Sequence, residues 1–409
     1  MTTSFSSTQK TWASDGGWSS LRAELLRSRG PLQRAAVWAS MLGFAVLIAI
    51  LTANAFLATE SSLGGGSDFA LGWRAGGHYL AHEPLYSVER DGGRPYKYPP
   101  WTTVLYVPLA LLSLDAAGLI WRLLTVISLV YSSAWTARRA GWPTTAAVAV
   151  AFWGFWNLNL IAGQPNVVWM AMCLWAFDRL EKKPFPAFAI LLTALTGKWF
   201  QAVALVAVPR ERFKLKPLLA VGALFLLVSI PVLWNPTGLS GLLASYRAAA
   251  TGGAGGLGGS AYGLPILFMD ALGLSRDDSG PRVLFFLPSA LLAWMALRGL
   301  QRRQVSLEEC FAAALGLSAA IHPMAYSYTF VFCLPLAACA ISRALESGDR
   351  VRQGLALFGL LGIAGLNEKT SGALGIFVEA HQIKAIGTFA LACSYLKGAP
   401  LGRASEGTC

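Results

Sequence analysis

Charged residues are scarce in this chain. Of its 409 residues only 13% are Asp, Glu, Lys or Arg, whereas 55% are hydrophobic. Water-soluble domains carry about 25% charged residues, so an ordinary soluble protein of this size is excluded. Apolar stretches long enough to cross a bilayer recur from Leu42 to the C-terminal region. Because a span in lipid must satisfy its own backbone hydrogen bonds, they predict an all-α integral membrane protein.

Cysteines with metal-ligand spacing are also lacking. Five of the six cysteines lie in apolar segments, and none forms a C-x-x-C pair, so neither a zinc site nor a disulfide framework is indicated. The formal net charge of +12 would suit a nucleic-acid partner. Short basic loops on one side of a membrane explain the same charge better, and we expect no nucleic acid to bind.

About 11 or 12 transmembrane helices are predicted. We expect residues 1–35 and 398–409 to be cytoplasmic tails and residues 36–397 to be the membrane domain. Residues 59–115 would form a long first outer loop with short juxtamembrane helices, and residues 234–280 a second outer loop. The expected spans are 36–58, 116–137, 144–160, 165–180, a broken pair within 186–209, 215–233, 281–299, 307–321, 326–342, 352–366 and 371–395.

The apolar stretch 100–113 is a special case. As a helix it would be about 21 Å long, too short for a hydrocarbon core of about 30 Å. If it crossed fully, Arg138 and Arg139 would lie outside. We therefore treat it as a half-buried interfacial helix, which places the basic clusters inside and gathers the polar residues of the spans on the outer face.

The first outer loop carries the strongest candidate for chemistry. Residues 68–81 are predicted to form a helix with Asp68 at its N-cap, and the preceding Gly64–Gly66 run would allow a ligand to approach closely. The alternative is that Asp68 merely caps the helix. His78 and His82, four apart on one helical face, could ligate a metal, but no third ligand is evident and no metal is expected.

Several short segments together resemble the GT-C glycosyltransferases, and most of all glycosyltransferase family 87, the polyprenyl-phosphate-mannose-dependent α-1,2-mannosyltransferases. The segments are Asp68 in a long outer loop, Pro84-Leu85-Tyr86, Tyr98-Pro99-Pro100, the turn Gly163-Gln164-Pro165-Asn166, Lys198 in a broken hairpin, and His322-Pro323. The resemblance covers roughly residues 36–345. It implies a GT-C fold and an inverting enzyme that moves a hexose, mannose being expected, from a polyprenyl-phosphate donor to a lipid or glycan acceptor. The reaction would occur on the outer face of the bacterial plasma membrane, towards the periplasm or cell exterior.

Such a reaction needs a base for the acceptor hydroxyl and cations for the departing phosphate. A lipid phosphate is already a good leaving group, so one carboxylate suffices as base, and Asp68 is the candidate; Glu83 and Glu89 are the alternatives for a second carboxylate. The donor phosphate and sugar would be bound by Lys198, His322, Gln164, Asn166, Arg74 and Lys97. His82 and Tyr86 would shape the acceptor site.

Each of these roles has a structural alternative. Lys198 could instead extend to the membrane interface, and His322 could form a hydrogen bond at a helix start. Gln164 and Asn166 could simply satisfy the backbone of a tight turn. The Trp-rich segment 153–156 could line a groove for a polyprenyl chain or belong to an interfacial aromatic belt.

No cofactor is expected apart from the polyprenyl-phosphate sugar, which is the donor substrate. The expected partners are that donor, a lipid or glycan acceptor, and membrane lipids. The competing hypothesis is a multi-span transporter of a lipid or polar solute. Transporters tend to show inverted repeats with sites at mid-depth; no repeat is evident here, and the polar residues gather at one face.

Overall fold

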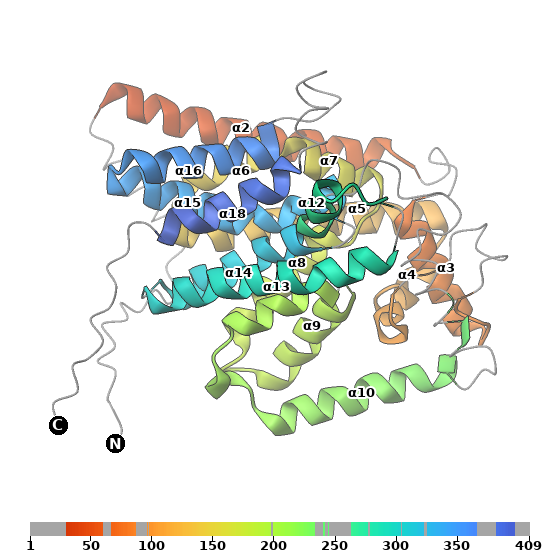
Figure 1. Cartoon of the computed structure of the whole chain (residues 1–409). Coiled ribbons are helices and arrows are strands. Elements are labelled where there is room, and N and C mark those ends of the chain that lie inside the picture. Colours follow the sequence, from red (N-terminus) through yellow and green to blue (C-terminus); the bar gives the residue numbers. More distant parts are fainter. Residues whose placement is uncertain are drawn as a thin grey trace, which may run out of the picture.

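The computed structural model describes residues 30–59, 67–86, 96, 98–197, 199–233, 240–241, 244, 263–276, 279–303, 305–322, 325–365 and 382–396. These residues form helices and no strand, which confirms the all-α prediction (Figure 1). The helices are α2 Pro31–Leu57, α3 Asp68–Leu80, η1 Pro100–Leu105, α4 Val107–Ala110, α5 Leu114–Ala140, α6 Trp142–Ala151, α7 Trp153–Ile161, α8 Asn166–Arg179, α9 Pro184–Gly197, η2 Trp199–Ala207, η3 Arg210–Arg212, α10 Leu215–Leu233, α12 Leu264–Ala271, α13 Ser279–Arg302, α14 Leu307–Ile321, η5 Ser327–Cys333, α15 Leu334–Ser347, α16 Arg350–Leu360, η6 Leu361–Gly365 and α18 Ile383–Leu396.

A helix or helix pair stands at each expected span. The stretch 100–113 forms η1 and the single-turn α4, which together are too short to cross a bilayer, as predicted. The expected broken pair within 186–209 is α9 followed by the 3₁₀ helix η2. Of the last expected span, 371–395, only the part from residue 382 onwards lies among the described residues.

The number of single helices that are long and apolar enough to cross a membrane is smaller than the expected number of spans. Among the described residues, four helices are long and apolar enough to cross a membrane, and α6 with α7 would make a fifth. Three further apolar helices, within α9, α10 and α18, are shorter. The prediction of about 11 or 12 spans counted apolar stretches, whereas several of these stretches form single helices, such as α8 with 14 residues and α14 with 15, that are shorter than a straight crossing of the bilayer needs.

The break between α6 and α7 was not predicted. The two helices meet at an angle of 61° at Phe152. A break leaves carbonyl groups at the end of the first helix without their usual partners. Here the indole Nε1 of Trp156 donates a 2.7 Å hydrogen bond to the carbonyl oxygen of Ala149, which satisfies one of them inside the bundle.

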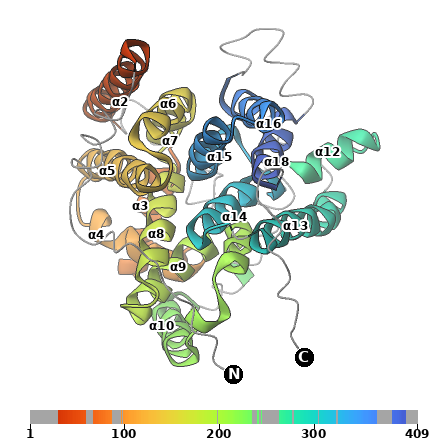
Figure 2. The ribbon, with the colours of Figure 1, turned by 90° about the vertical axis from the view of Figure 1, so that its left-hand side faces the viewer.

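The helices surround α14, in which every residue from Glu309 to Ile321 is buried. Figure 2 views the bundle along its helices, with α14 near the centre and α2 and α10 at the periphery. Both peripheral helices expose large apolar side chains, among them Leu42 at 66% and Leu226 at 67%. A water-soluble protein rarely exposes such surfaces, whereas lipid solvates them. The chain is a multi-pass membrane protein.

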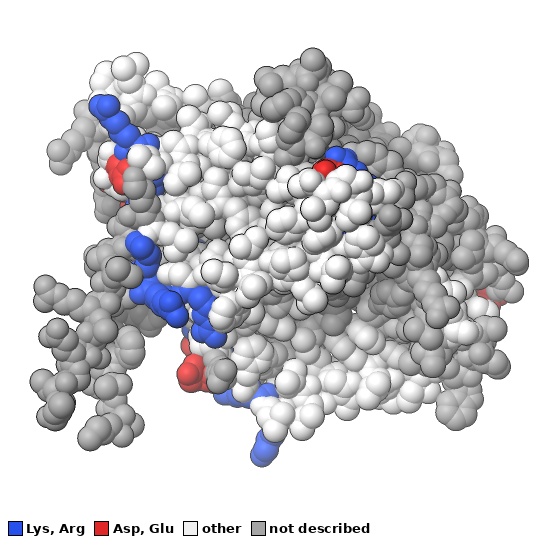
Figure 3. Space-filling model, viewed as in Figure 1, with Lys and Arg blue, Asp and Glu red and all other residues white. Residues whose placement is uncertain are grey.

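The two ends of the bundle differ in charge. At one end Asp178 binds Arg138 and Arg139 through contacts of 3.3 Å. Figure 3 shows Lys and Arg side chains along the edge where α13 ends, opposite the edge at which Figure 1 places α3 and α4. We call these the basic end and the α3 end.

Helix α3 packs closely on η1 and α4 because two glycines face them. A Cβ at Gly72 would overlap the Tyr106 ring, and a Cβ at Gly76 would lie 2.9 Å from the Tyr106 backbone carbonyl. Four residues apart, these glycines share one face of the helix. Helix α3 therefore lies tightly against η1 and α4.

Candidate active site

Helix α3 begins at Asp68, and its N-cap is the residue before it. The Ser67 hydroxyl accepts a 3.0 Å hydrogen bond from the Ala70 backbone N–H, as an N-cap side chain does. The prediction that Asp68 caps this helix is wrong, because Ser67 has the extended backbone of a cap while Asp68 is already helical. The Asp68 carboxylate is therefore left for other contacts.

The turn between α7 and α8 packs against the start of α3 and is held there by hydrogen bonds. The Asp68 backbone N–H donates to the Ala162 carbonyl at 2.9 Å, and the Trp121 indole donates to the Gly163 carbonyl at 3.1 Å. Gly163 has φ +64°, and a Cβ there would lie 2.5 Å from the Phe69 Cβ. Only glycine meets both requirements, so this turn can approach α3 closely.

The close approach brings Gln164 to Asp68. The Gln164 side-chain Nε2 donates a hydrogen bond to Asp68 Oδ2, and the Gln164 backbone N–H donates to the Asn159 carbonyl at 2.9 Å. Gln164 is 2% exposed, whereas Asp68 is half-buried. A buried amide therefore fixes the direction of a carboxylate that remains partly accessible.

Asn166 connects three helices beside this pair. Its Nδ2 donates to Asn159 Oδ1 at 2.9 Å, and Asn159 Nδ2 donates to the Tyr328 carbonyl at 2.9 Å. Within the described part of the chain, Gln164 Oε1 and Asn166 Oδ1 are buried and have no hydrogen-bond partner. Buried acceptors of this kind are normally satisfied, so they are places where ligand hydroxyls could donate.

Phenol side chains surround the carboxylate. Burial raises the pKa of Tyr98 well above its ordinary value, and the Asp68 charge raises it further. The pKa of Tyr106 is raised by burial and then by Tyr96 and Asp68, and that of Tyr326 by burial and Asp68. Tyr106 is buried, whereas Tyr98 and Tyr326 are half-buried, so the phenols that remain partly accessible are those of Tyr98 and Tyr326.

Comparison of the sequence with known protein families identifies the family of this chain. Residues 96–323, more than half of the chain, match the model of glycosyltransferase family 87. The chain belongs to glycosyltransferase family 87. No curated protein matched the chain, and no solved structure did.

The family 87 match is narrower than the expected resemblance over residues 36–345. It includes the turn with Gln164 and Asn166, as well as Lys198 and His322. Asp68 precedes the matched region. In the structure it accepts a hydrogen bond from Gln164, which is a residue of the matched region.

Of the predicted phosphate-binding residues of this family 87 protein, the structure describes some and not others. Lys97 and Lys198 lie outside the described residues. His322 is half-buried and follows the last residue of α14 as its C-cap, so it does not start a helix, contrary to the structural alternative. Arg74 lies on α3 six residues after Asp68, roughly 240° around the helix, so it faces away from the Asp68 side.

The predicted acceptor residues also differ from expectation. Tyr86 is buried, and its hydroxyl donates to the Tyr98 carbonyl at 2.9 Å, so it supports the wall of the site. His82 is exposed beyond the end of α3 with φ +55°. It therefore does not share a helical face with His78, whose Nδ1 lies 2.8 Å from Glu83. The idea of a His78–His82 metal pair is wrong, and the described residues contain no cluster of three potential metal ligands.

Three buried polar residues were missed by the sequence reasoning. Arg282 is 2% exposed, and Gln201 and Lys384 are fully buried. All three lie within or at the edge of apolar stretches, where charged and polar residues tend to be functional. That signal is present in the sequence.

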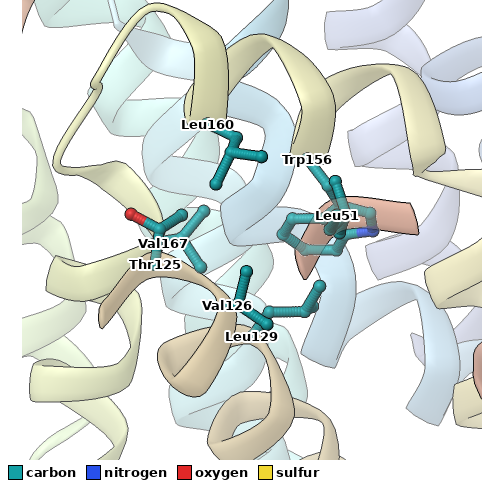
Figure 4. A pocket seen from close by; sticks show the side chains of 7 residues that line it. All are labelled: Leu51, Thr125, Val126, Leu129, Trp156, Leu160 and Val167. Atoms are coloured by element: carbon teal, nitrogen blue, oxygen red, sulfur yellow. The ribbon is translucent and has the colours of Figure 1, made fainter. Parts of the chain in front are cut away.

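Figure 4 shows a small cavity between α2, α5, α7 and α8. It has about 10 Å³ of room, which is enough for one water molecule. Leu51, Leu160 and Trp156 line it, and Thr125 is its one polar wall residue. The cavity is too small for a sugar or a lipid chain. Trp153, at 38% exposure, faces outward instead.

Proposed function

We propose that this protein is an inverting glycosyltransferase that moves a hexose, with mannose as the expected sugar, from a polyprenyl-phosphate donor to a lipid or glycan acceptor. Family 87 membership gives the glycosyltransferase class. The observation that supports this mechanism is the Asp68 carboxylate, half-buried and fixed by Gln164 at the α3 end of the bundle.

The proposed reaction is a single displacement. The acceptor hydroxyl oxygen attacks the anomeric carbon as its proton passes to Asp68. The bond between the anomeric carbon and the phosphate oxygen breaks, and its electron pair stays on the phosphate. One displacement inverts the anomeric centre, so a β-linked donor gives an α-linked product. No second carboxylate is needed, unlike in glycoside hydrolases.

The remaining roles follow the same chemistry. Lys198 and His322 would bind the lipid phosphate, with Arg74 and Lys97 further out, while Gln164 and Asn166 would face the sugar. His82 and Tyr86 would border the acceptor. Because basic residues favour the cytoplasmic side, the basic end would be cytoplasmic. The α3 end would then face the periplasm or cell exterior across a bacterial plasma membrane.

The donor class is tested by transfer assays on the purified protein in lipid nanodiscs. Labelled mannose or glucose would be supplied as the polyprenyl phosphate, the polyprenyl pyrophosphate or the nucleotide sugar, with a lipid extract of the source organism as acceptor. We expect label in a lipid or glycan product from polyprenyl-phosphate mannose alone. Transfer from a nucleotide sugar, or from none of the donors, would overturn the proposal.

A further inference from the structure

Arg282 lies at a position that folding alone disfavours. It is in the first turn of α13 and 2% exposed. The start of a helix is the positive end of its dipole, where a cation is unfavourable, and burying a guanidinium is costly in addition. Buried charges in the membrane segments of a protein tend to be functional, so Arg282 is a candidate for binding a ligand.

Arg282 lies near the candidate active site. The pKa of the Tyr326 phenol is raised by burial and by the Asp68 carboxylate, and it is lowered by Arg282. Tyr326 is therefore within electrostatic range of both groups. Its ring stacks on Tyr328 with a centroid distance of 5.3 Å, and the Tyr328 carbonyl binds Asn159. Figure 1 shows that α13 begins at the end of the bundle that carries α3 and α4, so Arg282 in the first turn of α13 and Asp68 at the start of α3 lie at the same end.

A second buried cation reinforces the positive potential there. Lys384 is fully buried in the first turn of α18. The neighbouring Gln382 accepts a 3.0 Å hydrogen bond from the Gly263 backbone N–H, and a Cβ at Gly263 would overlap the His322 carbonyl. The first turn of α18 therefore lies where α14 ends, and Tyr326 follows four residues after His322.

Two other arginines of the chain provide the comparison. Arg276 forms a two-contact ion pair with Asp270 at 2.7 and 2.8 Å and is part of a surface turn. Arg122 is as buried as Arg282, and its Nε donates to the Ala55 carbonyl at 3.1 Å. Arg122 lies in the middle of a long helix and ties two spans together, whereas Arg282 lies at a helix start beside the site.

We propose that Arg282 binds the phosphate of the lipid-linked donor, with Lys384 adding positive charge behind it. The inference rests on the proposed function. When the sugar leaves, the phosphodiester with one negative charge becomes a phosphomonoester with two. A guanidinium that donates hydrogen bonds to its oxygens stabilises this charge more in the transition state than in the bound donor. Arg282 would therefore influence both donor affinity and turnover.

The test compares two lipids that differ only in the phosphate. Binding of a short polyprenyl phosphate and of the corresponding polyprenol is measured on the protein in nanodiscs, for wild type, Arg282→Gln and Arg282→Lys. We expect Arg282→Gln to weaken polyprenyl phosphate binding about 10- to 100-fold and to leave polyprenol binding unchanged. Arg282→Lys should restore part of the affinity.

Two controls separate the possible outcomes. Arg276→Gln should leave both affinities unchanged, and Arg122→Gln should alter thermal stability without selecting between the lipids. Equal loss of both lipids in Arg282→Gln, or no loss of either, would overturn the inference. Failure of the proposed function is distinguishable, because in that case wild type would transfer no sugar from the polyprenyl-phosphate donor whatever Arg282 does.

Discussion

The side-chain amide of Gln164 donates a hydrogen bond to the Asp68 carboxylate across 96 residues of sequence. This contact joins the outer-loop helix α3 to the turn before α8. Ser67 rather than Asp68 caps α3, so the Asp68 carboxylate does not serve as the cap of this helix. The contact is the basis of the first prediction.

Gln164→Ala should lower kcat about tenfold and leave the KM for the donor nearly unchanged. The reason is that one hydrogen bond to a charged group is lost and the base is no longer held in its reactive direction. Initial-rate kinetics with the polyprenyl-phosphate donor check this. Gln353→Ala, which removes an amide bound to the Ala344 carbonyl elsewhere, is the matched control. An unchanged kcat in Gln164→Ala would show that Gln164 does not position the base.

Gly163→Ala should destabilise the protein and nearly abolish transfer. Alanine at φ +64° is strained by about 1–2 kcal/mol, and its Cβ would also collide with Phe69. Gly273 has φ +67° but open space around its Cβ position, so Gly273→Ala measures the strain alone. Melting temperatures and transfer rates of both variants should differ, with the larger losses in Gly163→Ala. Equal effects would mean that the turn does not depend on its closeness to α3.

Ser67→Ala should lower the stability of α3 by about 1 kcal/mol, the usual effect of losing an N-cap side chain. Ser113 precedes α5 in the same way but makes no side-chain cap hydrogen bond. Ser113→Ala should therefore change stability by less than about 0.5 kcal/mol. Hydrogen exchange of the α3 amides in the two variants provides the comparison, and faster exchange in Ser113→Ala than in Ser67→Ala would contradict the assignment.

Lys198→Ala and His322→Ala should each raise the KM for the donor about 10-fold or more, because a cationic contact to the lipid phosphate is removed. Donor titrations measure the effect. Lys182→Ala changes an exposed lysine between α8 and α9 at the basic end and should leave the KM unchanged. If either site variant behaves like Lys182→Ala, that residue does not bind the phosphate.

The helices, including α3 with Asp68 at its start, could be predicted because they depend on local signals. Apolar runs locate the spans, and the shortness of 100–113 shows that this stretch does not cross. The capping residue of α3 could not be predicted, since Ser67 and Asp68 are both good N-caps and only the backbone geometry separates them. The 61° bend at Phe152 likewise could not be predicted, because no proline lies next to the break.

The contacts of the site depend on tertiary packing, which no local pattern encodes. The approach of Gln164 to Asp68 requires both a left-handed glycine at 163 and the Trp121 hydrogen bond to that glycine's carbonyl. Arg282 and Arg276 both lie close to the start of an apolar stretch, and only the burial of Arg282 distinguishes the two. The sequence spacing places His78 and His82 on one helical face, but α3 ends at Leu80, before His82.

The most direct test of the account is sugar transfer by wild type and Asp68→Asn in nanodiscs, with polyprenyl-phosphate mannose as donor. Asparagine keeps the shape of the side chain but cannot accept the acceptor proton, so we expect kcat to fall about 10²- to 10⁴-fold while donor binding is retained. Asp270→Asn, which removes the partner of Arg276, should transfer at the wild-type rate. Transfer by Asp68→Asn within tenfold of wild type would contradict the assignment of Asp68 as the base.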